Sequence, residues 1–243
     1  MSKDYIPNNP AGRLTRLIRR LREVSGTTPM RAAWAHALGV DENNISELLA
    51  RITLAARLVD QTVIQIEGLA DLDHGLYLRW TPLVRGAFTD FGMSNQIARI
   101  TDRLTPEVLT GLDFCNHELS RRCPEQTVDM AKLEELTKEA KALMDQVVRA
   151  DLPGDLKEYV LDKLDLLLRA LEMYHVTGIR PIVSAMETIV GATVLGGKEH
   201  HEQLTKTPQG QRLWSLLGKV ATLIALAEGG RKLLECMGPL MGQ

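Results

Sequence analysis

A long apolar stripe near the middle of the chain constrains the fold more than any other feature of the sequence. After Leu152-Pro153-Gly154, apolar residues recur at three- and four-residue steps, and this spacing puts their side chains on one face of a helix. The stripe consists of Leu156, Val160, Leu164, Leu167, Leu168, Leu171 and Tyr174. Thr177-Gly178 separates this helix from a second apolar helix that runs to Leu195. Two such helices are stable when other helices cover their apolar faces.

The same helical spacing recurs along most of the chain. Helices are predicted over residues 10–24, 28–39, 45–67, 75–88, 105–123, 129–150 and 211–227, and residues 196–210 have the polar composition of an exposed loop. Aromatic residues make up only 4% of the chain, and Leu and Ala supply most of the apolar side chains, which favours helices over sheets. We therefore predict an all-α fold, a multi-helix bundle of about eight or nine helices with no sheet.

The chain is expected to form a single helical domain over residues 1–243. A chain of 243 residues can bury a core without support from a metal or a disulfide. Pro124 and its polar neighbours interrupt the apolar pattern between residues 122 and 129. This interruption is either a loose domain division or a longer inter-helix loop, and we favour the loop.

Net charge, cysteine content and apolar run length bound the class of protein. The formal net charge is −2, so nothing global points to nucleic acid, and the 3 cysteines are too scattered for a secreted disulfide framework. The N-terminus lacks the apolar segment of a signal peptide. The apolar run at residues 220–227 is too short for a membrane span, which needs about 20 residues. We expect a cytoplasmic protein without a transmembrane helix.

Residues 34–51 have the spacing of a helix-turn-helix. Ala35 is the small residue of the first helix, Gly39 forms the turn, and Ile45 is the apolar anchor of the second helix. A recognition helix needs donors near its start, but here three carboxylates come first and Arg51 follows a turn too late. Because carboxylates repel phosphate, we favour two core helices joined at a glycine cap. A helix-turn-helix regulator that binds nucleic acid is the alternative.

The first predicted helix carries a row of arginines opposite its apolar face. Residues 1–24 hold six basic and two acidic residues. A basic amphipathic helix can bind an anionic partner such as a lipid surface or nucleic acid. Residues 41–73 hold seven carboxylates against two arginines, so a solvated arginine face or pairing within the chain is the commoner outcome. The arginines that define this candidate surface are Arg13, Arg16, Arg19, Arg20 and Arg22.

Two groups of residues have the atom types of a metal site but the wrong spacing. On a helix, Cys115 and His117 are about 200° apart, so they cannot bind one ion together with Cys123 unless the helix unwinds. Residues 199–202, Glu-His-His-Glu, lack the i, i+4 histidine pair of a helical zinc site. We expect no metal ion and no other cofactor.

Asp71, Asp73 and His74 are the nearest approach to a catalytic group. Two carboxylates beside an imidazole can perform acid–base chemistry in a cleft. Asp73 also precedes a predicted helix, where aspartate is an ordinary N-cap. We favour the capping role and expect no catalytic residue, so the balance is toward a protein that is not an enzyme.

Two nearly neutral helices leave a membrane-acting effector as a further alternative. Residues 184–196 and 213–227 would form an apolar hairpin, interrupted only by Glu187 and Lys219. Each helix is shorter than a membrane span. Because central helices of a bundle have the same composition, we favour a core role for both.

Two stretches resemble bacterial helical proteins of no assigned activity. The first is Asp73-His74-Gly75-Leu76-Tyr77-Leu78-Arg79-Trp80. The second runs from Leu152 through Tyr174, Gly178 and Ala185-Met186-Glu187 to Gly191. The resemblance implies a bacterial origin and a shared fold, and it suggests a role in a defence or toxin-control system. It supplies no catalytic residue.

Apolar stripes without a convergent polar cluster are typical of a protein that works through its shape and surface. We therefore expect a non-enzymatic helical module for protein–protein interaction, acting as a scaffold or as a regulatory subunit of a bacterial assembly. The expected partner is another protein or a second copy of the chain. The alternatives are the nucleic-acid-binding regulator and the membrane-acting effector described above.

Overall fold

A computed structural model describes residues 9–89, 92–125, 127–195 and 206–228. Within these ranges the chain forms helices, turns and loops, with one isolated β-bridge between Pro29 and Gln96 and no strand. The predicted all-α fold is confirmed. The chain divides into two compact units, Met1–Glu125 with His175–Gly178 (unit 1) and Gln126–Tyr174 with Ile179–Gln243 (unit 2). The boundary after Glu125 falls inside the interrupted stretch at residues 122–129.

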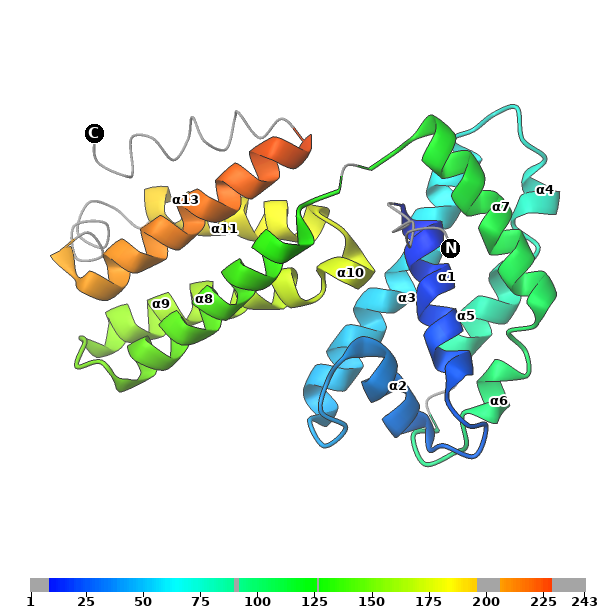
Figure 1. The fold of residues 1–243 in the computed structure, drawn as a ribbon, viewed down its shortest axis with the longest axis horizontal. Helices are drawn as coiled ribbons and strands as arrows, with labels where there is room; N and C mark the ends of the chain where they lie inside the picture. The colour runs from blue at the N-terminus through cyan, green and yellow to red at the C-terminus, as the bar shows by residue number, and fades with distance from the viewer. Residues whose placement is uncertain (1–8, 90–91, 126, 196–205, 229–243) are drawn as a thin grey trace. The chain divides into compact units, whose positions relative to one another are not determined.

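Unit 1 is built around its N-terminal helix, α1 (Figure 1). Its helices are α1 (Pro10–Glu23), α2 (Met30–Leu38), α3 (Ile45–Glu67), α4 (His74–Tyr77), α5 (Thr81–Thr89), α6 (Ala98–Thr101) and α7 (Pro106–Arg122). The helix α1 packs against α2, α3 and α7, and it buries Leu14, Ile18 and Leu21 among them. The helix α3 also packs against α5.

The predicted helix over residues 75–88 is divided in the structure. One turn, α4, ends at Tyr77, and α5 begins at Thr81. Pro82 lies in the first turn of α5, where its missing N–H costs nothing and its fixed φ suits a helix start. The prediction of one continuous helix through Pro82 is therefore wrong.

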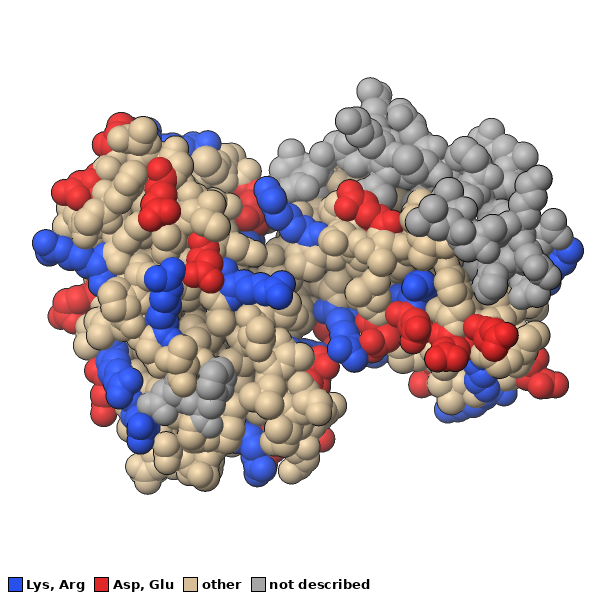
Figure 2. Space-filling model, turned by 180° about the vertical axis from the view of Figure 1, so that it is seen from behind, with Lys and Arg blue, Asp and Glu red and all other residues tan. Residues whose placement is uncertain are grey.

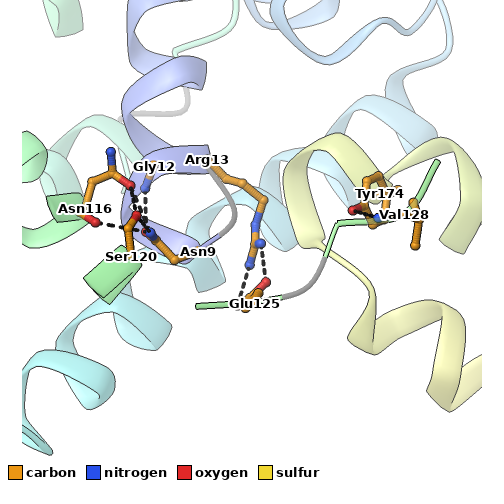
Figure 3. A network of polar contacts seen from close by, with 8 residues as sticks. All are labelled: Asn9, Gly12, Arg13, Asn116, Ser120, Glu125, Val128 and Tyr174. Atoms are coloured by element: carbon orange, nitrogen blue, oxygen red, sulfur yellow. Dashed lines mark hydrogen bonds and ion pairs between the residues drawn. The ribbon is translucent and has the colours of Figure 1, made fainter. Parts of the chain in front are cut away.

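Unit 2 is a group of four long helices with one apolar core. They are α8 (Met130–Arg149), α9 (Gly154–Glu172), α11 (Arg180–Leu195) and α13 (Pro208–Glu228), and the single turn α10 (Tyr174–Thr177) separates α9 from α11. The predicted stripe is buried, from Leu156 on α9 to Tyr174 at the start of α10, except that Leu168 is only partly covered. Tyr174 accepts a hydrogen bond of 3.1 Å from the Val128 backbone N–H (Figure 3).

The helix α13 begins three residues before the predicted start at Gln211. Pro208 occupies its first turn, and the Thr207 hydroxyl accepts a hydrogen bond of 3.2 Å from the Gly210 N–H. Residues 208–210 are therefore helical and not part of the predicted loop, while residues 196–205 lie outside the described ranges. Over the described residues, no helix is both long and apolar enough to cross a membrane.

Candidate functional site

An apolar pocket of about 600 Å³ lies in unit 1, between the α4–α5 segment and the first half of α7. Figure 1 shows the elements that form it. The α4–α5 wall consists of Leu76, Tyr77, Arg79, Trp80 and Leu83, and the α7 wall of Thr105, Pro106, Glu107, Val108, Thr110, Gly111 and Phe114. This volume lies within the range of about 300–1,000 Å³ that is typical of ligand-binding pockets.

Large apolar side chains surround the pocket and remain accessible. Leu76 is 57% exposed, Leu83 is 43% exposed and Phe114 is 60% exposed. They are three of the nine large apolar residues that are exposed among the described residues. Large contiguous patches of exposed apolar side chains are uncommon on the surface of a monomer, and where they occur they mark interaction sites.

Trp80 is buried beside these exposed residues, and a glycine on α7 makes room for it. The tryptophan is only 3% exposed. A Cβ atom added at Gly111 would stand 3.1 Å from Trp80 Cδ1, which is closer than ordinary contact. Gly111 therefore lets α7 approach the indole ring, and the turn between α4 and α5 packs against α7 at the pocket.

Cys115 is buried on α7 and is not a reactive group. Its thiol donates a hydrogen bond of 3.3 Å to the Tyr77 carbonyl. Burial raises the pKa of the Cys115 thiol to about 11, against a small opposing effect of the Trp80 side chain. Because the thiolate is the nucleophilic form, the neutral Cys115 serves packing at neutral pH.

The pocket rim carries one charge of each sign. Arg79 is exposed on the α5 side and has no ion-pair partner among the described residues. Glu107 lies on the α7 side, where a hydrogen bond from Thr105 holds the pKa of its carboxyl below the ordinary value. Glu107 is therefore anionic at neutral pH, and the remaining lining residues are uncharged.

The arginines of α1 bind partners inside unit 1. Arg13 forms two hydrogen bonds with Glu125, of 2.5 and 3.2 Å (Figure 3). Arg19 pairs with Asp113 at 2.8 Å. Arg20 and Arg22 donate to backbone carbonyls, those of Ala37 and Leu104. Four of the five arginines therefore donate hydrogen bonds within the chain. Their carboxylate partners are Asp113 and Glu125, not the carboxylates of residues 41–73.

Arg16 is half-buried, and the external anionic partner of this helix stays a prediction. Figure 2 shows basic and acidic side chains interspersed over the part formed by α1 to α7, on the left of that view, without a large patch of one sign. An electrostatic footprint for nucleic acid consists of clustered Lys and Arg side chains.

A buried polar network joins the start of α1 to the second half of α7 (Figure 3). The Asn9 amide donates to Asn116 Oδ1 at 2.9 Å and to Ser120 Oγ at 2.8 Å. Its Oδ1 accepts a hydrogen bond of 3.0 Å from the Gly12 N–H and so caps the helix. All three side chains are neutral amides or hydroxyls, and their contacts with one another serve to fix α1 on α7.

The residues of the predicted helix-turn-helix are arranged as a helix cap. Ala35 is buried, Gly39 ends α2 with a φ of 65°, and Ile45 is 40% exposed at the start of α3. Arg51 is only 7% exposed and pairs with Glu47 at 2.8 Å. It also donates to the Leu38 carbonyl at 3.3 Å, so its guanidinium covers the end of α2. Binding of nucleic acid by this segment stays a prediction.

The ionisable residues near α4 point to different partners. Asp71 pairs with Arg122 at 2.5 Å, and this hydrogen bond lowers the pKa of Asp71. Asp73 accepts a hydrogen bond of 3.1 Å from the Leu76 N–H and caps α4, as the sequence indicated. His74 Nε2 bonds to the Leu69 carbonyl at 3.0 Å. The three side chains thus have separate partners.

No metal-ligating cluster of three or more His, Cys, Asp or Glu occurs in the part of the chain that the structure describes. Cys115 is buried on one face of α7, whereas His117 is exposed on another, in keeping with their separation on a helix. Cys123 is exposed after the end of α7. Residues 199–202 lie outside the described ranges.

Comparison of the chain with protein-family models, with curated proteins and with solved structures found no match.

The pocket was not predicted from the sequence. A local signal was present on α7, where Val108, Leu112, Cys115 and Leu119 form the buried stripe and Phe114 stands outside it. A large aromatic residue off the apolar stripe of a helix is a candidate contact for a partner.

Proposed function

We propose that this protein is a non-enzymatic helical interaction module that binds another protein through the pocket of unit 1. In this function it acts as a scaffold or as a regulatory subunit of an assembly. The observation that carries the proposal is the gathering of exposed Leu76, Leu83 and Phe114 around a pocket backed by buried Trp80. Interfaces combine such an apolar centre with a polar rim.

The energetic argument rests on the exposed fractions of these side chains. Full burial of a leucine or phenylalanine side chain is worth about 1.5–3 kcal/mol. Because Leu76, Leu83 and Phe114 are each about half exposed, covering all three would contribute on the order of 3 kcal/mol. Trp80 and Val108 give a partner side chain a preformed apolar floor, so little side-chain ordering opposes binding.

The chemistry of the lining supports binding more than catalysis. Arg79 and Glu107 are its only charged groups, and they belong to opposite walls. The nearest nucleophile, Cys115, is a buried neutral thiol. A general acid or base needs a pKa near the working pH, and the lowered pKa of Glu107 moves away from that value.

Site-specific photocrosslinking in cells of the source organism tests this function. We would place the photoreactive amino acid p-benzoylphenylalanine at position 114, and separately at position 64 as a control. Ile64 is 68% exposed on α3 and does not line the pocket. We expect a discrete polypeptide adduct from position 114 that disappears with Leu83→Asp, and no such adduct from position 64.

Two results would contradict the proposal. One is the absence of any position-specific polypeptide adduct at residue 114. The other is an adduct that persists unchanged with Leu83→Asp, because Leu83 faces the same pocket from the opposite wall. Leu226→Asp is the matched control for added charge, since Leu226 is 72% exposed in unit 2.

A further inference from the structure

We infer that the docking element of the partner is an amphipathic helix with acidic residues on the flank beside Arg79 and basic residues on the flank beside Glu107. This inference rests on the proposed function, and it names the chemistry and the orientation of the partner. It draws on three features of the pocket, namely its helical walls, its apolar lining and the two charges at its rim.

The helical walls favour a helical occupant. The walls consist of α4, the first turn of α5 and the first half of α7. The carbonyls of Leu78, Trp80 and Thr105 already accept hydrogen bonds from the N–H groups of Thr81, Val84 and Leu109. An extended peptide in this apolar pocket would find few backbone partners for its N–H and C=O groups, and burying them unpaired is costly. A helix pairs these groups internally and presents side chains at i, i+3, i+4 and i+7 to a groove.

The apolar lining fixes the face that a partner helix presents. Leu76, Trp80 and Leu83 lie on the wall formed by the α4–α5 segment. Phe114 lies on the opposite wall, formed by α7. Large aliphatic or aromatic side chains of the partner would fill this pocket best. The residues that contribute most to an interface typically occupy packed pockets from which the surrounding contacts exclude water.

The rim charges fix the direction in which that helix lies. Arg79 is exposed and unpaired in the described structure, so an acidic side chain of the partner gains an attractive contact there. Glu107 keeps its negative charge, because the Thr105 hydroxyl and its own backbone N–H favour the ionised form. Arg22, which lies near Glu107, donates to the Leu104 carbonyl. A helix with opposite charges on its two flanks matches this rim in one orientation.

Exposed charge pairs add little affinity and mainly decide between orientations. We therefore expect the apolar anchors to decide whether a peptide binds and the flanks to decide which peptides bind best. Reversing Arg79 should change the affinity of a matched peptide about two- to fivefold. Removing the apolar character of Phe114 should abolish binding.

Selection from a peptide library on the full-length protein tests the inference. The library holds helical peptides of about five turns, or about 18 residues. Anchor positions vary among Leu, Ile, Phe and Trp, and flank positions among Asp, Glu, Lys, Arg and Ser. Each enriched peptide is then measured against wild type, Phe114→Asp, Arg79→Glu and Arg57→Glu. Arg57 is exposed on α3 and does not line the pocket, so it controls for net charge.

We expect enriched peptides to carry acidic residues on one flank and basic residues on the other. They should lose binding to Phe114→Asp and should bind Arg79→Glu about two- to fivefold more weakly. A peptide with its acidic flank changed to lysine should regain affinity for Arg79→Glu only. The Arg57→Glu variant should bind like wild type.

The two proposals fail in distinguishable ways. Peptides that require Phe114 but show no charge bias, or that bind Arg79→Glu and Arg57→Glu alike, would overturn the assigned polarity and leave docking in the pocket intact. Enrichment of proline-containing extended peptides that require Phe114 would overturn the helical partner. If no peptide is enriched, or if all bind Phe114→Asp as tightly as wild type, the pocket is no docking site and the proposed function fails as well.

Discussion

The glycine that ends α2 gives the sharpest test of the fold of unit 1. Gly39 has a φ of 65°, in the left-handed region, and a Cβ added there would meet no atom within 4 Å. The Val40 N–H bonds to the Ala35 carbonyl at 3.0 Å, which closes the helix in a Schellman-type turn. In the folded state, Gly39→Ala therefore adds backbone strain without a steric clash.

The size of the effect follows from two opposing contributions. The left-handed conformation costs an L-residue about 1–2 kcal/mol. Alanine also restricts the unfolded chain, which stabilises the fold by about 0.4–1 kcal/mol. The free energy of unfolding should fall by about 1 kcal/mol in Gly39→Ala. Gly39→Asn should lose less, because asparagine adopts this conformation more readily.

Gly68, which ends α3 in the same unit, is the matched control. Its φ is −68°, and a Cβ there would make only ordinary contacts, at 3.4 and 3.5 Å. Gly68→Ala should therefore raise stability, by about 0.4–1 kcal/mol. Both variants carry the same chemical change at the end of a helix, and they differ in the sign of φ.

Urea unfolding followed by tryptophan fluorescence measures both variants. Trp34 on α2 and Trp80 belong to unit 1, and Trp34 packs on Phe88 with ring centroids 5.2 Å apart. With an m-value of about 2 kcal/mol per M, Gly39→Ala should lower the midpoint by about 0.5 M. If Gly39→Ala leaves the midpoint unchanged or raises it, or if the two variants shift it alike, the left-handed cap is wrong.

Three further predictions concern the pocket and its surroundings. Trp80→Ala should destabilise the protein by about 3–5 kcal/mol because the indole is buried, whereas Phe114→Asp at an exposed position should change stability by no more than about 0.5 kcal/mol; equal losses in urea unfolding would contradict the burial pattern. Cys115, whose thiol pKa is raised to about 11 by burial, should stay unlabelled by a thiol reagent at about pH 8, while exposed Cys123 reacts; rapid labelling of native Cys115 in a digest analysed by mass spectrometry would refute this. The lowered pKa of Asp71 stabilises the fold above the ordinary carboxyl pKa of about 4, and this contribution is lost as the pH falls through the folded pKa. Arg122→Gln should raise the pKa of Asp71 toward its ordinary value in an NMR titration, and an unchanged pKa would show that the Arg122 hydrogen bond is not its cause.

The sequence by itself determined the helices and several of their ends. On α9, the row from Leu156 to Leu171 predicted the buried face, because three- and four-residue spacing aligns side chains whichever helix covers them. Gly39 and Asp73 were predicted as caps from their neighbours alone, since capping joins groups within a few residues. Pro82 and Pro208 carried the same local signal, and the boundaries missed there were legible in the sequence.

The tertiary structure alone decided where the arginines pair and where the pocket lies. Arg19 forms an ion pair with Asp113, which is 94 residues away in the sequence. Trp80 packs against Gly111 of α7. Apolar periodicity tells which face of a helix is covered but not which helix covers it, and every arginine could equally face water. The pocket exists because Trp80, in the turn before α5, packs on Gly111 of α7 while Leu76, Leu83 and Phe114 stay uncovered. That outcome depends on how the helices pack, and spacing along the chain does not encode it.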